Sequence, residues 1–373
     1  MKSWLKTGVV IGTVSYYVAC APVKFGADNS APSGPTLKCT GSSCYQEHND
    51  QITIAKEPID VLFIVDDSGS VSDVQANIAS RFNSFLNQLG QLDYRIGITT
   101  TDISSSVSDT RNNPPAVTNR YGALQDGKLI QVAGSGDFFV TPLTPNPAAA
   151  FGNTIQLPET ATCANSGYEP SQCPSGDPRA IFAANLLIDA NPHGFLRPSV
   201  PLTIVIVSDS DERNSLDLAT EGYPQGHNDL PATLIANLNA KFPGKSLVVD
   251  AIVTKPGDTA CYNARYGRDG NPHLFAWYAR VYAELVTKTS GVLGSVCASD
   301  YTAQLGQIGA GVSQQAKTIT LACQPQGNTY SVTFSPQPST TINTNVDWAT
   351  KKLSFSAPPA PGTVVTVSYH CPL

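Results

Sequence analysis

Charged side chains are scarce in this chain of 373 residues. Aspartate, glutamate, lysine and arginine make up 14% of it, and 29 acidic residues against 23 basic ones leave a net charge of −6. A nucleic-acid-binding protein needs a basic surface, and so does one that binds anionic lipid through charge. The composition argues against both modes of binding, while a hydrophobic content of 41% is enough to build a folded core.

The familiar catalytic motifs are also absent. The five histidines show no metal-ligand spacing, and there is no CxxC pair, GxSxG elbow, HExxH helix or GxxxxGK[ST] loop. Asp66 and Asp67 are adjacent and do not make the DxD spacing of haloacid-dehalogenase-like phosphatases. The sequence therefore predicts a binding module and not an enzyme.

The N-terminal apolar stretch, residues 8–19, is too short for an ordinary membrane-spanning helix, which needs about 20 residues. It follows a short basic segment and ends in Tyr17-Val18-Ala19-Cys20, which resembles a bacterial lipobox. Cleavage at a lipobox leaves the cysteine as the lipidated N-terminus. We predict residues 1–20 as a signal peptide with lipidation at Cys20, and favour this over an ordinary cleaved signal peptide.

Nine cysteines are present, and setting Cys20 aside leaves an even number, as a disulfide set in an oxidising compartment requires. Sequence alone permits many connectivities. Closeness along the chain favours four local pairs: Cys39–Cys44, Cys163–Cys173, Cys261–Cys297 and Cys323–Cys371.

The composition divides the rest of the chain into three parts. Residues 21–55 are rich in Ser, Gly, Pro and Thr, which predicts a flexible tether. Over residues 56–316, buried-strand patterns such as 59–65 alternate with helical patterns, which predicts a doubly wound, mostly parallel α/β domain. Residues 317–373 contain only short strand-like runs between turn residues, which predicts a small all-β module stapled by a disulfide.

Oxygen-bearing side chains follow two of the predicted strands. Asp66 comes directly after the strand 59–65, with Ser68 and Ser70 in the following turn, and Asp209 follows the strand 202–207. Ligands of an open α/β sheet bind at the carboxyl ends of its strands, so we expect these side chains to lie together. Carboxylates and hydroxyls are hard ligands of the kind that Mg²⁺ prefers. We therefore predict a metal site, with a simple helix N-cap as the alternative.

Asp66-Asp67-Ser68-Gly69-Ser70 looks like the DxSxS element of the metal-ion-dependent adhesion site (MIDAS) of von Willebrand factor A (vWA) domains. Val207-Ser208-Asp209-Ser210 looks like the later strand-end aspartate of that family, and the likeness covers roughly residues 59–315. The resemblance implies a divalent ion, Mg²⁺ in preference to Mn²⁺ or Ca²⁺, whose coordination an acidic group of a partner completes. The implied ligands are Asp66, Ser68, Ser70 and Asp209.

The family supplies a further ligand, a threonine, from a loop before a helix at the edge of the sheet. The corresponding loop here is long, and Thr162, Ser166 and Ser175 are equal candidates for that role. Three other acids near the site are interpreted as solvated rim residues that attract cations: Asp67, Asp211 and Glu212.

A finer pattern, Tyr94–Asp102 and Gly194–Arg197 leading into Val207–Glu212, is similar to A-domain lipoproteins of predatory and gliding bacteria. The resemblance implies an adhesin that is lipid-anchored to the outer membrane, on its surface or periplasmic face. It would bind a protein or surface ligand, or other envelope proteins. The alternatives are a structural envelope scaffold with a non-essential metal site and, less favoured, a metal-assisted hydrolase.

Overall fold

The computed structural model describes most of the chain from residue 35 onward. The predicted signal peptide with Cys20, and the candidate ligand Ser175, lie outside the described residues. None of the described helices is both long and apolar enough to cross a membrane. The residues left out are 1–34, 41–42, 54–57, 91, 104–125, 170–171, 175, 215–225, 266–276, 317, 326, 328, 349–350, 358, 361 and 373.

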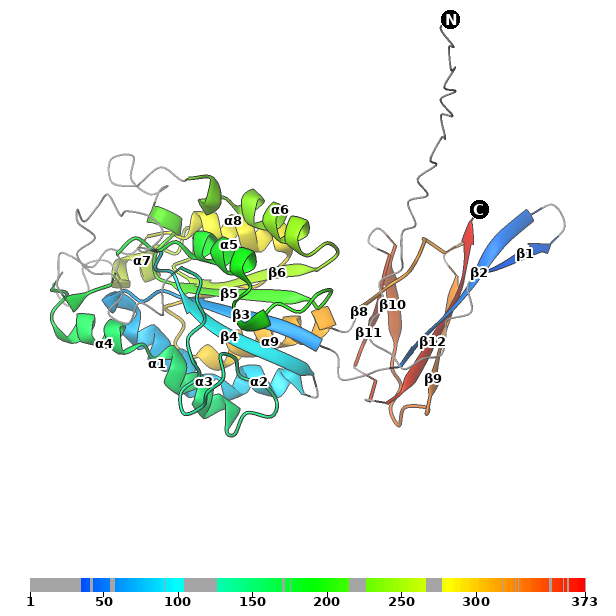
Figure 1. The fold of residues 1–373 in the computed structure, drawn as a ribbon, viewed down its shortest axis with the longest axis horizontal. Coiled ribbons are helices and arrows are strands. Elements are labelled where there is room, and N and C mark those ends of the chain that lie inside the picture. The colour runs from blue at the N-terminus through cyan, green and yellow to red at the C-terminus, as the bar shows by residue number, and fades with distance from the viewer. Residues whose placement is uncertain are drawn as a thin grey trace, which may run out of the picture. The chain divides into compact units, whose positions relative to one another are not determined.

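Five parallel strands form the sheet of the α/β domain (Figure 1). Their order is β4-β3-β5-β6-β7, and every neighbouring pair runs parallel. Every residue of β5 is buried, as expected for a strand covered on both faces. The strands are β3 (Pro58–Val65), β4 (Asp93–Thr100), β5 (Leu202–Ser208), β6 (Leu247–Val253) and β7 (Leu293–Ser295).

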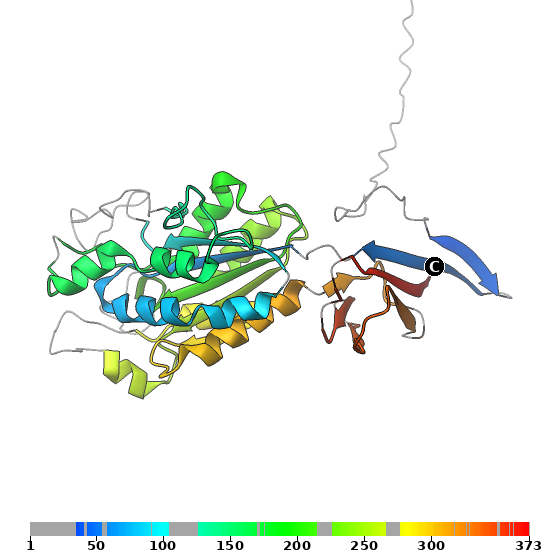
Figure 2. The same ribbon diagram turned by 90° about the horizontal axis from the view of Figure 1, so that it is seen from below.

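Helices cover both faces of this sheet (Figures 1 and 2). In β3, Val61 and Phe63 belong to the core with α1, α2, α3 and α9, whereas Leu62 and Ile64 belong to the core with α5, α6 and α8. This alternation is the two-residue period of a strand, and it confirms the predicted α/β architecture. The helices are α1 (Ser72–Arg81), α2 (Asn83–Leu89), α3 (Pro147–Ile155), α5 (Ala180–Ala190), α6 (Pro231–Lys241), α8 (Arg280–Thr289) and α9 (Tyr301–Ala316).

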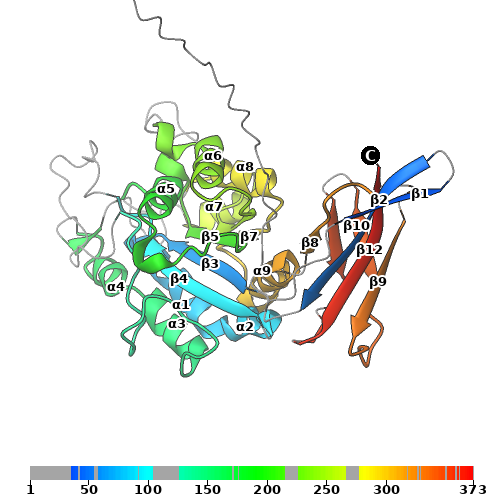
Figure 3. The ribbon, with the colours of Figure 1, turned by 45° about the vertical axis from the view of Figure 1, so that its right-hand side comes forward.

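Antiparallel strands form a separate β module (Figure 3). One sheet has the order β1-β2-β12-β9 and the other β10-β11-β8. Leu353, Phe355, Val365 and Val367 are buried in its hydrophobic core. The strands are β1 (Thr36–Thr40), β2 (Ser43–Thr53), β8 (Thr318–Thr320), β9 (Tyr330–Ser335), β10 (Thr344–Asp347), β11 (Lys352–Phe355) and β12 (Val364–Pro372).

The prediction of a flexible tether over residues 21–55 is wrong for β1 and β2. β2 pairs antiparallel with β12, from Tyr45 opposite Pro372 to Thr53 opposite Val364. Backbone amides and carbonyls make this pairing, so a strand with many polar side chains can still form. The β module therefore includes strands from both ends of the described chain and is not limited to residues 317–373.

The structure contains the four predicted disulfides. Cys39–Cys44 joins β1 to β2, and Cys323–Cys371 links the segment after β8 to β12. The other two, Cys163–Cys173 and Cys261–Cys297, lie in the α/β domain, and both are close to the candidate site described below.

A buried cluster of charges joins the strands near their amino ends. Asp60 of β3 is fully buried, and its carboxylate contacts Arg197 Nε at 2.8 Å and Lys245 Nζ at 2.9 Å. Arg197 also contacts Asp93 of β4 at 2.6 Å. Burial lowers the pKa of Lys245, while Asp60 opposes this shift. The buried carboxylate of Asp60 thus contacts two cations from the segments before β5 and β6, and Asp93 supplies the second negative charge of the cluster.

We expect Asp60→Ala to destabilise the protein by about 3–5 kcal/mol, because it leaves the buried Lys245 without its carboxylate and removes one of the two acids that contact Arg197. The control is Asp189→Ala, which removes the exposed pair with Lys241 and should cost at most about 1 kcal/mol. Urea unfolding followed by circular dichroism measures both losses. Similar losses in the two variants would contradict this role of the Asp60 cluster.

Candidate functional site

The two predicted acids lie at the same edge of the sheet. β3 and β5 are parallel neighbours with Val65 opposite Val207, so Asp66 and Asp209 leave adjacent strands at their carboxyl ends. The backbone amide of Asp66 donates to the carbonyl of Val207 at 2.8 Å. Both aspartates are 1% exposed. The fold thus places two carboxylates beside each other in a nearly dry environment.

Hydrogen bonds connect these acids to the serines of the turn. The Ser68 amide donates to Asp66 Oδ1 at 2.9 Å, and the Ser208 hydroxyl donates to Asp66 Oδ2 at 2.6 Å. The Ser70 hydroxyl donates to Asp209 Oδ1 at 3.1 Å and lies 3.1 Å from the Ser68 hydroxyl. The structure therefore brings together Asp66, Ser68, Ser70 and Asp209, as the sequence predicted. Sequence reasoning did not identify Ser208 as a partner of Asp66.

Gly69 lets the turn pack closely against a disulfide. A Cβ at Gly69 would lie 2.7 Å from Cys163 Sγ and 3.0 Å from the backbone nitrogen of Ala164. Both belong to α4 (Pro158–Asn165). A larger residue would push the turn away from α4, so glycine at this position keeps Ser68 and Ser70 in place.

Asp66 carries a charge that the surrounding protein does not neutralise. Among the described residues, no lysine, arginine or histidine forms an ion pair with it. Burial and the nearby Asp209 carboxylate raise the pKa of Asp66 to about 6, although hydrogen bonds from Ser208 and Ser68 act in the opposite direction. A cation placed between the two acids would relieve their repulsion.

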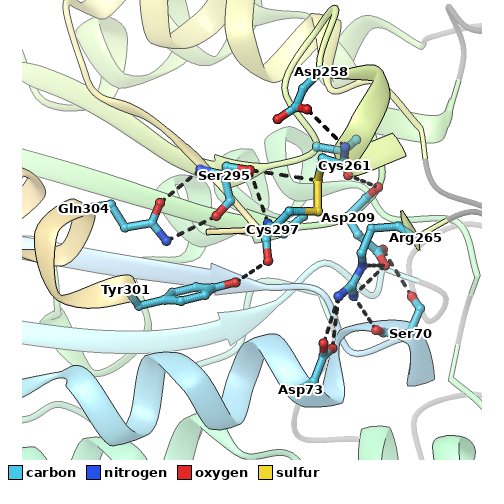
Figure 4. Close-up of a disulfide and its surroundings, with 12 residues drawn as sticks. Ser70, Asp73, Asp209, Asp258, Cys261, Arg265, Ser295, Cys297, Tyr301 and Gln304 are labelled. Carbon is cyan, nitrogen blue, oxygen red and sulfur yellow. Dashed lines mark hydrogen bonds and ion pairs between the residues drawn. A yellow bond between two sulfur atoms is a disulfide. The ribbon is translucent and has the colours of Figure 1, made fainter. Parts of the chain in front are cut away.

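Asp209, in contrast, has a cationic partner that the sequence did not reveal. Arg265, the last residue of α7 (Thr259–Arg265), donates from Nη2 to Asp209 Oδ2 at 3.0 Å (Figure 4). The same guanidinium donates to Asp73 Oδ2 at 2.9 Å and to the carbonyl of Ser70. Arg265 lies in no recognisable motif and is far from Asp209 along the chain. The only nearby signal is Cys261, one helical turn earlier.

The additional hydroxyl ligand implied by the family is not located. The Thr162 hydroxyl donates to the Pro158 carbonyl at 2.8 Å, and that of Ser166 donates to the Cys163 carbonyl at 2.8 Å. Both hydroxyls thus bond to the backbone of α4. Ser175, the third candidate, is among the residues that the structure does not describe.

A different hydroxyl, that of Thr160, hydrogen-bonds to the backbone of the turn. Buried Thr160 donates to the carbonyl of Asp67 at 2.7 Å and accepts from Gln75 Nε2 at 3.1 Å. Gln75 Nε2 also donates to the carbonyl of Asp66 at 3.0 Å. These bonds use backbone carbonyls of the turn and not the carboxylate of Asp66.

The prediction that Asp67, Asp211 and Glu212 form a solvated rim is wrong, because all three are at most 1% exposed. Asp211 accepts hydrogen bonds from backbone amides of residues 280–282 at the start of α8. Glu212 accepts those of residues 181–182 in α5. The first amides of a helix need acceptors and favour negative charge, which explains why these acids are buried.

Asp67 is buried without helix amides that donate to its carboxylate within the described residues. Neither of its carboxylate oxygens accepts a hydrogen bond in the part of the chain that the structure describes. Burial, reinforced by the carboxylates of Asp102, Asp66 and Glu159, raises its pKa well above the usual value. Burial thus favours the protonated form of Asp67 and opposes its negative charge.

The donor set of the site fits a small, hard divalent ion. It consists of two carboxylates and two hydroxyls, all oxygen ligands. Within the described ranges, no three His, Cys, Asp or Glu side chains gather so that they could hold a metal ion. The candidate site therefore depends on the serine hydroxyls as much as on the acids, and it leaves coordination positions for water or an external group.

Comparison with known proteins adds little to this description. No protein-family model and no curated protein match the chain. Among solved structures, the pilus adhesin SpaC of Lactobacillus rhamnosus GG overlaps 91% of this chain and 42% of its own, with 11% identity and a TM-score of 0.30. Proximal thread matrix protein 1 of the mussel byssus overlaps 74% and 51%, with 12% identity and a TM-score of 0.35.

Manganese-loaded TRAP protein of Plasmodium vivax overlaps 65% of this chain and 75% of its own, with 11% identity and a TM-score of 0.27. The chain thus spans about half the length of the first two structures. Scores this low establish no family.

The buried acids predict how stability depends on pH. Burial raises the pKa of Asp250 to about 7, and its Oδ1 accepts the amide of Val292 at 2.7 Å. The folded state therefore retains a proton that the unfolded state releases near pH 4. Stability from this group is present below about pH 4 and is lost as the pH rises toward 7, by about 1.4 kcal/mol per pKa unit.

We expect Asp250→Asn to flatten the fall in unfolding free energy between pH 4 and 7, since the amide does not titrate. Asp66 and Asp211, whose pKa values burial raises to about 6 and about 7, retain part of the slope. Urea unfolding in the presence of chelator at several pH values measures the slope. Parallel curves for the wild type and the variant would contradict the assignment.

Proposed function

We propose that the protein binds a partner through a divalent cation at Asp66, Ser68, Ser70 and Asp209. One observation carries this proposal: two buried carboxylates at the ends of adjacent strands contact the same turn, whose Ser68 amide donates to Asp66 and whose Ser70 hydroxyl donates to Asp209. Within the described residues, the hydrogen-bond donors to the Asp66 carboxylate are neutral and come from Ser68 and Ser208. Such an arrangement is costly unless a cation is bound.

The chemistry of the donors favours Mg²⁺, with Mn²⁺ and Ca²⁺ as alternatives. Mg²⁺ prefers oxygen ligands in an octahedral arrangement and usually keeps several of its waters. Two carboxylates and two hydroxyls leave positions that an acidic group of a partner can take. Once bound, the ion would supply the positive charge that attracts such a group.

We further propose that the chain is a vWA-domain adhesin of the bacterial outer membrane, anchored by lipid at Cys20. The MIDAS-like arrangement around Asp66 supports the vWA assignment. The lipobox-like sequence supports the anchor, and the four disulfides suit an oxidising compartment. The partner would be a protein or surface ligand with an acidic group, or another envelope protein.

Isothermal titration calorimetry with Mg²⁺ tests the ion site in the full chain carrying Cys20→Ser, which prevents lipidation. We expect a single bound ion, and a loss of at least about 100-fold in affinity for Asp66→Asn, because the variant removes a charged ligand without changing shape. Asp189→Asn, which alters an exposed aspartate, should bind as the wild type does. Absence of Mg²⁺ binding in the wild type would refute the proposal.

The same substitution separates the binding function from a scaffold role. In cells that carry the lipidated protein, we expect Asp66→Asn and chelator each to abolish attachment to the partner surface, while the amount of protein at the membrane is unchanged. Attachment that survives both treatments would favour the scaffold. Immunoblotting of membrane fractions is the control for protein level.

A further inference from the structure

Hydrogen bonds hold both carboxylate oxygens and the backbone carbonyl of Asp209 in the structure. Its Oδ1 accepts the Ser70 hydroxyl at 3.1 Å, and its Oδ2 accepts Arg265 Nη2 at 3.0 Å and Nε at 3.3 Å. Its backbone carbonyl accepts the hydroxyl of Thr254 and the amide of Trp277, each at 3.1 Å. The two carboxylate oxygens therefore have different neighbours: Oδ1 faces the serines of the turn, and Oδ2 faces the guanidinium.

Arg265 is bound too firmly to be an incidental contact. Its side chain is 5% exposed, and Nη1 contacts Asp73 Oδ2 at 2.9 Å. Nη2 additionally donates to the carbonyl of Ser70. A guanidinium is permanently charged and presents its donors in a rigid fork, so moving it would break contacts with three groups at once. Figure 4 shows the side chain reaching between α1 and Asp209.

A disulfide holds the helix that carries this arginine. Cys261 of α7 is bonded to Cys297, just beyond β7. The amide of Cys261 also donates to Asp258 Oδ1 at 3.0 Å, and the amide of Cys297 donates to the Ser295 hydroxyl at 3.2 Å. A helix of seven residues has little stability of its own, so these links keep Arg265 in place before any ion arrives.

We propose that Arg265 determines which ion the candidate site selects, by occupying Oδ2 of Asp209 and leaving a single carboxylate oxygen, Oδ1, for the ion. This inference rests on the proposed function. Ca²⁺ takes up to about eight oxygen ligands and often binds both oxygens of one carboxylate, whereas Mg²⁺ is octahedral. Restricting Asp209 to one oxygen lowers the number of available ligands. Arg265 is thus a positioning residue that favours Mg²⁺ over Ca²⁺.

Calorimetry with Mg²⁺ and with Ca²⁺, in the full chain carrying Cys20→Ser, tests whether Arg265 sets the preference between the two ions. The readout is the ratio of the two dissociation constants, because a general disturbance of the site weakens both ions together. We expect Arg265→Gln to reduce the preference for Mg²⁺ by at least about tenfold. The control, Arg95→Gln, removes a half-buried arginine of β4 that donates to the Gly194 carbonyl and should leave the ratio unchanged.

Two further variants keep the test decisive if Arg265→Gln does not fold. Arg265→Lys retains the charge but loses the fork, and Cys261→Ser with Cys297→Ser frees α7 without changing any charge. Each should lower the preference for Mg²⁺ in the same direction as Arg265→Gln.

The outcomes distinguish the two proposals. A wild type that binds Mg²⁺ with a ratio unchanged in all folded Arg265 variants would overturn the role of Arg265 and leave the proposed function intact. A wild type that binds neither ion would overturn the proposed function. Ion binding that occurs only after Arg265 is replaced would overturn both, because the arginine would then be a substitute for the metal.

Discussion

The parallel pairing of β3 with β5 is the constraint on which the site depends. It places Asp66 and Asp209 at the ends of adjacent strands, where both are nearly dry and repel each other. Helix amides donate hydrogen bonds to Asp211 and Glu212, and a guanidinium donates to Asp209. Neither carboxylate oxygen of Asp67 accepts a hydrogen bond within the described residues, and burial raises the pKa of this acid well above its usual value. Asp66 accepts hydrogen bonds from neutral groups of Ser68 and Ser208, and among the described residues no cation pairs with it.

The two ends of the sheet handle charge differently. Near the strand starts, Asp60 and Asp93 are matched by two cations, Arg197 and Lys245, and the cluster joins β3 and β4 to the segments before β5 and β6. At the carboxyl ends, the described residues that contact Ser70 and Asp209 include one cation, Arg265, which Asp209 shares with Asp73. A cluster in which the charges balance stabilises the pairing of the strands. A cluster with excess negative charge is stabilised when a cation binds from solution.

The sequence predicted the parts of this structure that depend on local pattern. The buried strands, the helices on both faces, the four disulfides and the grouping of Asp66, Ser68, Ser70 and Asp209 follow from apolar runs, short cysteine spacings and turn residues at strand ends. β1 and β2 were not found, because a polar strand paired through its backbone has the composition of a linker. The sequence pattern also does not predict the burial of acids such as Asp211. Its carboxylate oxygens accept amides at the start of α8, a helix distant in sequence.

Arg265 shows why the rest of the site could not be predicted. Its partners come from three separate segments, and only the folded chain places them together. The additional hydroxyl ligand is a similar case, since Thr162 and Ser166 lie in the expected region but bond to their own helix. Position along the chain identifies candidates for a ligand, whereas the direction of each side chain is decided by packing.

The hairpin of β1 and β2 has a mechanical consequence. Tension applied between the N-terminus and the α/β domain enters β1 at Thr36 and leaves β2 at Thr53. It would peel β1 from β2 one residue pair at a time, from Thr36 opposite Glu47 as far as Cys39 opposite Cys44. There the disulfide transfers the load directly to β2, which is paired with β12 along most of its length. Under load this hairpin can lengthen only by the few residues that precede Cys39.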